Sequence, residues 1–236
     1  SSSLERLWDC LDASQVMAIP HHTATFPFRR EWDKHDARFQ RLLEIFQDRR
    51  GNYEYEGAPA APGVACPEQM QEHRVKGGYA LDALHEGHRV GFCSGGDHMG
   101  VSMTGVFAEA LTREAVFAAL YARHCYGTTH PTVHLNVTCV LGTTGRLLGM
   151  MGDEIELLER TEVTIHTKAT GPCPVSEIAL ITPIGVRETR HPCTCEVDET
   201  FLVQVPPVGE TSWFYVRIMR DDGGIAWASP IWLTGR

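Results

Sequence analysis

The second half of the chain is dominated by β-type patterns, and this feature most constrains the fold. After residue 129, alternating or β-branched runs are separated by turn residues. These runs are TVHLNVTCV, TEVTIHTKA, SEIALITPIG, ETFLVQVPP and SWFYVRIMRDDGGIAWASPIWL. Alternation with a period of about two is typical of half-buried strands, and the Asp-Gly chemistry in RDDGGIAW predicts a hairpin. We therefore expect a mostly antiparallel, sandwich-like β domain over residues 130–236.

The first half alternates helix-like and strand-like segments. The expected strands are QVMAIP, RLLEIF, RVGFCS and TGVFAEA, and the expected helices include GGYALDALHEGH and LTREAVFAALYARHCYG. Gly87 suits the end of the first of these helices, and Thr112 suits the N-cap of the second. This alternation predicts an α/β domain over residues 1–129, with the boundary near residue 129.

Composition limits the possible partners. The apolar fraction of 43% is enough for a real core, and the net charge of -9 argues against nucleic acid as a partner. No apolar run approaches the roughly 20 residues that span a bilayer, so we expect no membrane partner. The chain begins with Ser1 rather than Met, which suggests a piece of a longer protein and leaves its compartment and oligomeric state open.

Two of the expected strands end in imidazole and carboxylate groups. QVMAIP is followed by His21 and His22, and RVGFCS is followed, after two glycines, by Asp97 and His98. Ligands of α/β sheets lie at the carboxyl ends of the strands. The side chains of these four residues are therefore expected to lie around one opening at that edge of the sheet. Imidazole and carboxylate are ligands for zinc, manganese or iron, and all four are candidate metal ligands. The alternative is that one or more of the histidines is structural, with His22 supporting a ligand rather than binding metal.

Two further residues are candidates for catalysis. Glu44 lies inside the apolar run RLLEIF, where a carboxylate is costly unless a metal or a cation accompanies it. Its alternative is a solvent-facing position or a pair with Arg41. Arg29 follows the histidine pair and suits a phosphate oxygen, with a solvated surface position as its alternative.

The motifs IPHHT, RLLEIFQDRRGNYEYEG, GHRVGFCSGGDHMG and GVFAEALTREAVFAALYARHCYGTT occur in this order. Together with the late WFYVRIMRDDGGIAWASPIW, they make the chain resemble domain of unknown function 3604. This bacterial family is related to the PHP (polymerase and histidinol phosphatase) metallohydrolases. The resemblance covers nearly the whole chain, with residues 87–129 its most specific part. It implies a distorted (β/α) barrel with two or three metal ions, usually zinc, manganese or iron, and phosphoester hydrolysis by metal-bound hydroxide. In the resemblance, His21, Glu44 and His98 match the family's motif positions.

The chain departs from the PHP pattern at two places. It contains no His-x-His pair, and the Asp of the expected Asp-x-His motif is replaced by Gly96, with Asp97 one position later. The sequence therefore suggests the C-terminal part of a PHP-like barrel, and whether this part is an enzyme by itself stays open. The expected substrate is a small molecule, possibly a phosphorylated one. The alternative function is a non-catalytic binding module whose contact candidates are four aromatic residues: Trp213, Tyr215, Trp227 and Trp232.

Overall fold

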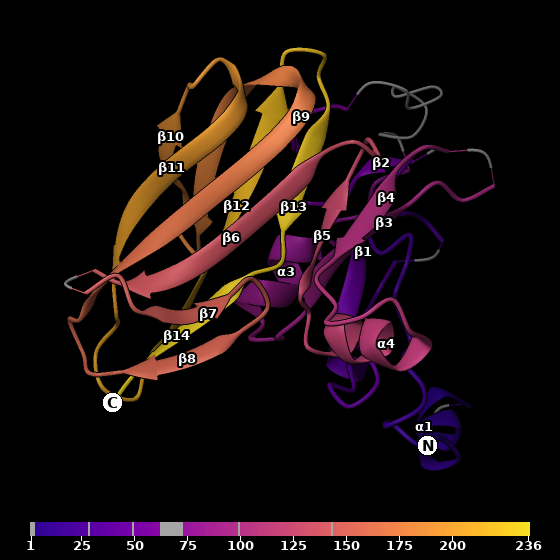
Figure 1. Cartoon of the computed structure of the whole chain (residues 1–236). Helices are drawn as coiled ribbons and strands as arrows, with labels where there is room; N and C mark the ends of the chain where they lie inside the picture. Colours follow the sequence, from indigo (N-terminus) through magenta and orange to yellow (C-terminus); the bar gives the residue numbers. More distant parts are fainter. Residues whose placement is uncertain (1–2, 28, 49, 62–72, 99, 143) are drawn as a thin grey trace.

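The structure is a computed structural model that describes residues 3–27, 29–48, 50–61, 73–98, 100–142 and 144–236 (Figure 1). Its helices are α1 (Ser3–Asp9), the 3-10 helix η1 (Trp32–Lys34), α3 (Ala80–His85) and α4 (Arg113–Tyr121). Its strands are β1 (Leu42–Gln47), β2 (Gly51–Asn52), β3 (Gly91–Gly95), β4 (Met103–Val106), β5 (Cys125–Thr128), β6 (His134–Leu141), β7 (Leu147–Met150), β8 (Glu154–Leu157), β9 (Glu162–Thr182), β10 (Gly185–Arg190), β11 (Thr194–Gln204), β12 (Thr211–Arg220), β13 (Ile225–Ala228) and β14 (Ile231–Gly235). Among the described residues, no helix has the length and apolar character that a membrane crossing requires.

The strands form a small mixed sheet and a large curled sheet (Figure 1). The small sheet has the order β2-β1-β3, in which β1 runs parallel to β3 and antiparallel to β2. The large sheet contains 11 strands; its path is β4-β5-β13-β12-β9-β6-β7, with β10 and β11 attached to β9, β14 attached to β12, and β8 attached to β14. Its pairs are antiparallel except for β14 with β8. It contains β4 and β5 as well as every strand after residue 129, so the proposed division into two domains remains a prediction.

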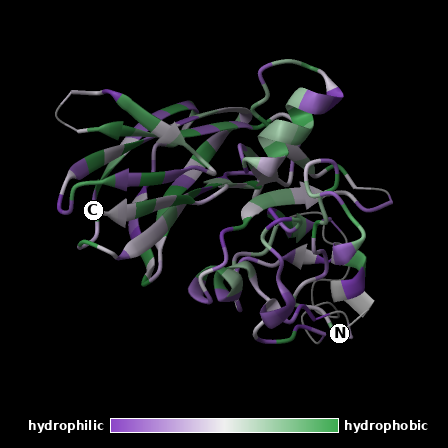
Figure 2. Ribbon diagram, turned by 90° about the horizontal axis from the view of Figure 1, so that it is seen from below, coloured by the Kyte–Doolittle hydropathy of each residue, from purple (hydrophilic) through white to green (hydrophobic). Residues whose placement is uncertain are grey.

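Strand β12 lies between two cores, which explains its almost continuously apolar sequence. Phe214, Val216 and Ile218 belong to the core inside the curled sheet. Trp213 and Tyr215 point the other way and pack with residues of β1, β3 and α3. Because successive side chains of a strand face opposite sides, a strand covered on both faces is apolar throughout. Figure 2 shows how hydrophobic and hydrophilic residues are distributed along these strands.

The aromatic residues suggested as contacts of a binding module are therefore core residues. Trp213, Tyr215, Trp227 and Trp232 are all buried, with at most 6% of their surface exposed. The suggestion that they meet a partner is wrong, because their rings fill the space between the large sheet and the small one. Large aromatic side chains are buried for the same physical reason in most sheet proteins.

The prediction of an α/β fold with a partial (β/α) barrel is wrong. In the described residues of the first half, only β1 and β3 form a parallel pair, and β2 pairs with β1 in the opposite direction. The run QVMAIP is not a strand; residues 16–20 lie beside β1 and share only the bonds Ala18 N–H to Phe39 O and Glu44 N–H to Pro20 O. Helices α3 and α4 are six and nine residues long. The described part of the first half thus lacks the repeated crossover helices that a barrel needs.

Several local predictions are confirmed. Thr112 caps α4, accepting a hydrogen bond on its hydroxyl from the backbone N–H of Ala115 at 3.2 Å. Gly87 follows α3 with a φ of 86°, a left-handed conformation that glycine adopts without strain. The hairpin joining β12 to β13 turns at residues 221–224, as its Asp-Gly sequence indicates. Local turn and cap chemistry is therefore easier to predict than the arrangement of the strands.

Candidate metal site

A bulge in β1 places two polar side chains on one face. Glu44 pairs with Cys93 and Phe46 pairs with Ser94, so Ile45 is an extra residue in β1. A regular strand would turn Glu44 and Gln47, three positions apart, to opposite faces. The extra residue restores a common direction, and both side chains line the same cavity. The Ile45 carbonyl accepts a hydrogen bond from Tyr53 N–H at 2.7 Å, which satisfies part of the irregular backbone.

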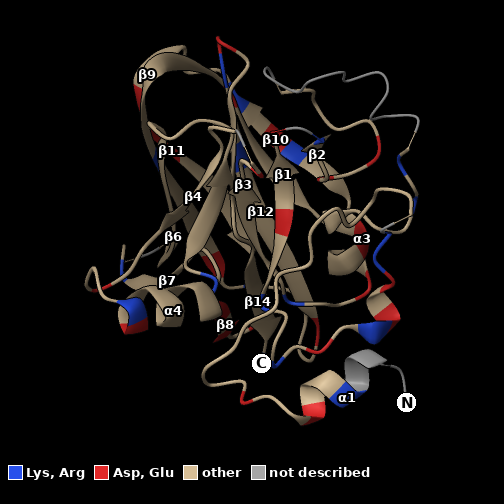
Figure 3. Ribbon diagram, turned by 90° about the vertical axis from the view of Figure 1, so that its right-hand side faces the viewer, with Lys and Arg blue, Asp and Glu red and all other residues tan. Residues whose placement is uncertain are grey.

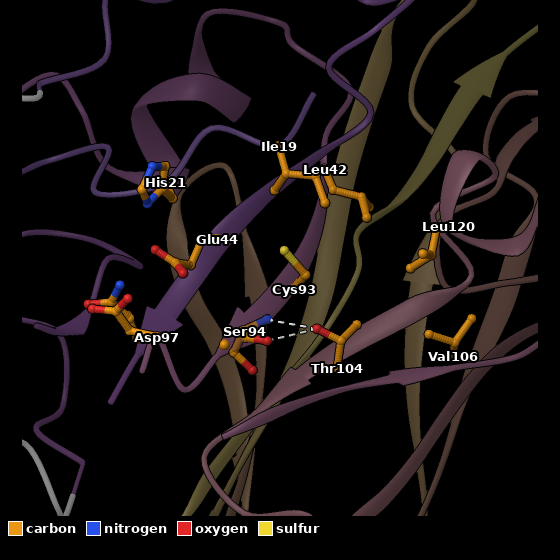
Figure 4. Close-up of a pocket in the computed structure, with 12 residues that line it drawn as sticks. Ile19, His21, Leu42, Glu44, Cys93, Ser94, Asp97, Thr104, Val106 and Leu120 are labelled. Carbon is orange, nitrogen blue, oxygen red and sulfur yellow. Dashed lines mark hydrogen bonds between the residues drawn. The ribbon is translucent and has the colours of Figure 1, made fainter. Parts of the chain in front are cut away.

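The cavity lies at the carboxyl ends of the parallel strands β1 and β3. Its volume is about 440 Å³. It is lined by Ile19, His21, Leu42, Glu44, Gln47, Cys93, Ser94, Gly95, Asp97, Thr104, Val106 and Leu120. Figure 4 shows His21, Glu44 and Asp97 on one side of this space, with Val106 and Leu120 on the other. The sequence placed polar residues at strand ends, and the structure brings three of the named residues to one cavity.

Two of the residues that line the cavity, His21 and Glu44, form a cluster with the neighbouring His22. Each has one potential ligand atom, and these atoms all lie within 4.8 Å of one another. The imidazole rings of His21 and His22 are 4.2 Å apart between centroids. The hydrogen bond from Glu44 N–H to Pro20 O, 3.0 Å long, fixes the histidine segment beside β1. His22 N–H in turn donates to Glu44 Oε2 at 3.4 Å.

His22 is held in the neutral form. Burial first, and then the neighbouring His21 and Arg50, lower its pKa to about 4. Its Nδ1 lies 3.4 Å from Tyr53 Oη, and its Nε2 lies 3.4 Å from Gln47 Nε2. The Gln47 amide is a donor, so Nε2 accepts and Nδ1–H donates to the tyrosine. A neutral imidazole held in a fixed orientation is the form in which histidine binds or supports a metal.

Glu44 is a buried acid that forms no salt bridge among the described residues, and Arg50 is the cation whose charge opposes the rise in its pKa. It is 9% exposed, and burial is the main cause that raises its pKa to about 7; Asp97 raises it further, and His22 N–H opposes the shift. The nearby Gln47 Oε1 is buried and has no hydrogen-bond partner among the described residues. Among the described residues, Gln47 Oε1 thus has no donor, and the Glu44 carboxylate has only the long bond from His22 N–H. This is the environment that a bound divalent cation would complete, so the residues fit a metal.

The loop after β3 explains why position 96 is a glycine and why the aspartate stands one position later, at Asp97. A Cβ at Gly96 would lie 2.7 Å from the Gly100 backbone, and Gly100 N–H donates to Gly96 O at 2.7 Å. No side chain fits at position 96. Asp97 lines the cavity instead, from a left-handed backbone with a φ of 52°. His22 has a similar φ of 54°, and such conformations in residues other than glycine cluster at functional sites.

Asp97 lines the cavity but is not one of the three clustered residues, and the remaining candidates, His98 and Arg29, also lie outside the cluster. The His98 side chain is 80% exposed, lines no part of the cavity and contacts Asp97, with Nε2 and Oδ1 3.2 Å apart. Arg29 is exposed and packs beside Gly77, where an added Cβ would meet its Nη2 at 2.6 Å. Neither side chain is brought to the ligand cluster. Gln47, by contrast, was missed, because nothing in the sequence marks the bulge that turns it into the cavity.

The chain is similar to longer chlamydial proteins of uncharacterized function. It is 26% identical over 255 aligned residues to a protein of Chlamydia pneumoniae, 23% over 261 to one of Chlamydia trachomatis serovar D and 22% over 261 to one of Chlamydia muridarum. Each alignment covers 98% of this chain and 40% of the relative, so the chain spans about 40% of the length of these curated relatives. No family model matches the chain. The resemblance to domain of unknown function 3604 and to the PHP metallohydrolases therefore stays a prediction.

Proposed function

We propose that the cavity binds a divalent metal ion through His21, Glu44 and Asp97, and that the chain is part of a metal-dependent hydrolase. The observation that carries the proposal is the cluster that His21 and His22 form with the buried carboxylate of Glu44. An isolated buried carboxylate is unfavourable unless a cation or hydrogen bonds compensate it. The weak bond from His22 N–H supplies little compensation.

Each residue has a distinct role in this proposal. His21 and Glu44 are the metal ligands, and Asp97 joins them from the loop after β3. His22 supports the site, because its ring nitrogens already face Tyr53 and Gln47. The mixture of imidazole and carboxylate suits zinc, manganese or iron. A metal bound here would lower the pKa of a coordinated water and would offset negative charge on the substrate oxygen.

The shape of the site favours a catalytic metal over a purely structural one. Structural metal sites are closed by protein ligands, whereas catalytic sites keep a position open for water or substrate. Here the candidate ligands line one side of a cavity of about 440 Å³, which leaves room beside them for a small molecule. Hydrolysis of a phosphoester, the reaction that the resemblance suggests, remains part of this proposal.

Metal titration of the purified chain tests the proposal. Zn²⁺ and Mn²⁺ are titrated calorimetrically into the chain and into His21→Ala and Glu44→Gln variants. We expect each substitution to weaken binding by more than the 10–100-fold that is typical of losing an outer-shell partner. His191→Ala is the control, because His191 is an exposed residue that contacts Ser176 O. Equal affinity in all four proteins would contradict the proposed site.

A further inference from the structure

The cavity beside the proposed metal site has one apolar side. Ile19, Leu42, Cys93, Val106 and Leu120 line it, and Figure 4 shows them extending away from His21, Glu44 and Asp97. Leu42 and Cys93 come from β1 and β3, Val106 ends β4, and Leu120 comes from the last turn of α4. Leu42 and Cys93 form the buried floor. A ligand held at the carboxylate end would therefore extend over aliphatic surface.

The hydroxyl groups at this side are already used by the backbone. Ser94 Oγ lies 2.7 Å from Met103 O and accepts from Thr128 N–H at 2.7 Å. Thr104 Oγ1 donates to Ser94 O at 2.9 Å and accepts from Ser94 N–H at 3.1 Å. These bonds join β3 to β4 and β5 and leave the hydroxyls turned toward the main chain. A sugar or polyol would thus lose its bonds to water without finding partners here.

The buried thiol on this side also behaves as an apolar group. Cys93 Sγ donates to Leu43 O at 3.3 Å, and burial raises the pKa of the thiol well above its usual value. A neutral thiol in this position packs as a small hydrophobic side chain. As far as the chain is described, the lining contains no lysine or arginine. A second charged group on the ligand would therefore have no counterion at the apolar side.

We propose that the apolar side binds an unbranched alkyl group of the substrate, whose reacting ester or phosphoester lies at His21 and Glu44. The position of the reacting group rests on the proposed function, whereas the alkyl group follows from the lining alone. A cavity of about 440 Å³ is within the range of small-molecule sites, which are mostly apolar with a few polar groups at one end. The substrate class is thus a short-chain alkyl ester or phosphoester rather than a sugar phosphate or a nucleotide.

A series of n-alkyl phosphonates, from ethyl to octyl, tests this inference by calorimetric titration of the Zn²⁺-loaded and the metal-free chain. Burial of each added methylene is expected to tighten binding about fourfold until the cavity is full. The Val106→Thr variant keeps the side-chain shape and adds a hydroxyl group. It is expected to weaken hexyl phosphonate binding several-fold and to leave ethyl phosphonate nearly unchanged. Leu120→Ser is a second variant at a partly exposed position, and Leu111→Ser, at a residue that is 98% exposed, is the control.

The outcomes separate the inference from the proposed function. Affinity that does not change with chain length, or Val106→Thr and Leu120→Ser variants that bind hexyl phosphonate as well as the control does, would overturn the alkyl site. A chain-length dependence in the metal-free chain, together with no Zn²⁺ binding, would support the alkyl site and overturn the metal site. Binding of Zn²⁺ with no chain-length dependence would support the metal site alone.

Discussion

Two buried glutamates only ten positions apart have opposite surroundings. Glu54 is fully buried and accepts hydrogen bonds from three groups: Tyr215 Oη at 2.6 Å, Arg217 Nη1 at 3.0 Å and Trp227 Nε1 at 3.0 Å. Glu44 is 9% exposed and accepts one long bond, 3.4 Å, from His22 N–H. Both carboxylates are buried, but among the described residues only that of Glu54 has three hydrogen bonds and a counterion within the protein.

This difference separates a structural acid from a candidate functional one. The partners of Glu54 all come from β12 and β13, so its network fastens the segment after β2 to the large sheet. In a hydrogen-bond network of this kind the carboxylate oxygens already have partners. The network therefore fixes the structure and leaves no oxygen available to a ligand. Glu44 has the opposite character, because its oxygens face a cavity and a histidine cluster. Figure 3 shows acidic and basic residues spread over many elements, so charge alone does not distinguish the two.

The strongest test of the comparison is the Glu54→Gln variant. The substitution keeps the shape but removes the charge that faces Arg217, whose side chain is only 4% exposed. Loss of one partner of a buried ion pair costs about 3–5 kcal/mol in the free energy of unfolding, and the lower end of this range is expected here because Arg217 keeps Glu177 as a partner at 3.3 Å. Urea denaturation followed by tryptophan fluorescence measures this loss. Glu199→Gln, at a surface residue near Arg190, is the control, with a change of at most about 0.5 kcal/mol. If Glu54→Gln lowers the free energy of unfolding no more than the control does, Glu54 does not have the proposed structural role.

The sequence distinguished these two acids only in part. Glu44 stands out because four of the five other residues in RLLEIF are apolar, and a charge there requires an explanation. Glu54 lies in GNYEYEG, a loop-like stretch, and its partners are more than 160 positions away. No pattern within one segment encodes a pair at such a separation. The same reason defeated the fold prediction, since local patterns in the first half resemble βα repeats but do not determine strand pairing.

The site residues that the sequence predicted are those that follow or interrupt an apolar strand of the parallel pair. Glu44 and Asp97 were identified from apolar runs followed or interrupted by carboxylates, and β1 and β3 do lie side by side in parallel. Gln47 depends on the bulge at Ile45, and the turn at Gly96 depends on its closeness to Gly100. Both features arise from tertiary contacts, which a one-residue change in register would alter.

The second test of the comparison uses the metal-free Glu44→Gln variant. The pKa of Glu44 is raised to about 7, so the folded protein binds a proton more tightly than the unfolded chain. This stabilisation is complete below about pH 4.5 and is lost as the pH rises through about 7. Glutamine mimics the neutral acid, and we expect it to stabilise the metal-free protein by about 2 kcal/mol at about pH 8, with little effect at about pH 4.

Urea midpoints measured with a chelator at both pH values check this expectation. Gln47→Glu is the matched opposite change, because it adds a second acid to the same cavity and is expected to destabilise the metal-free protein at the higher pH. If Glu44→Gln changes the free energy of unfolding equally at both pH values, burial does not raise the pKa of Glu44. Glu44 and Glu54 would then not differ in the way proposed.

The third test has the smallest expected effect. It asks whether every buried polar group without a hydrogen-bond partner indicates a ligand site. His35 is such a group outside the cavity, since both of its ring nitrogens are buried without hydrogen-bond partners among the described residues. Its ring lies 4.4 Å from that of His88 between centroids. Burial, followed by the charges of His88 and Arg30, lowers its pKa to about 4. A histidine with a lowered pKa contributes stability above about pH 6.5 that is lost as the pH falls toward 4.

Replacement of His35 by phenylalanine should therefore flatten the acid side of the stability profile. The ring shape is kept and the unpartnered nitrogens disappear, so the variant is expected to be at least as stable as the natural chain near neutral pH. At about pH 4.5 it should be more stable by about 1 kcal/mol, a value reduced by the partial exposure of the ring. His134→Phe, at an exposed position, is the control. If His35→Phe instead weakens Zn²⁺ binding and leaves the acid profile unchanged, a missing partner would not by itself locate the site. The assignment at Glu44 would then depend on its cluster of three potential ligand atoms, because His35 has the His88 ring beside it but belongs to no such cluster among the described residues.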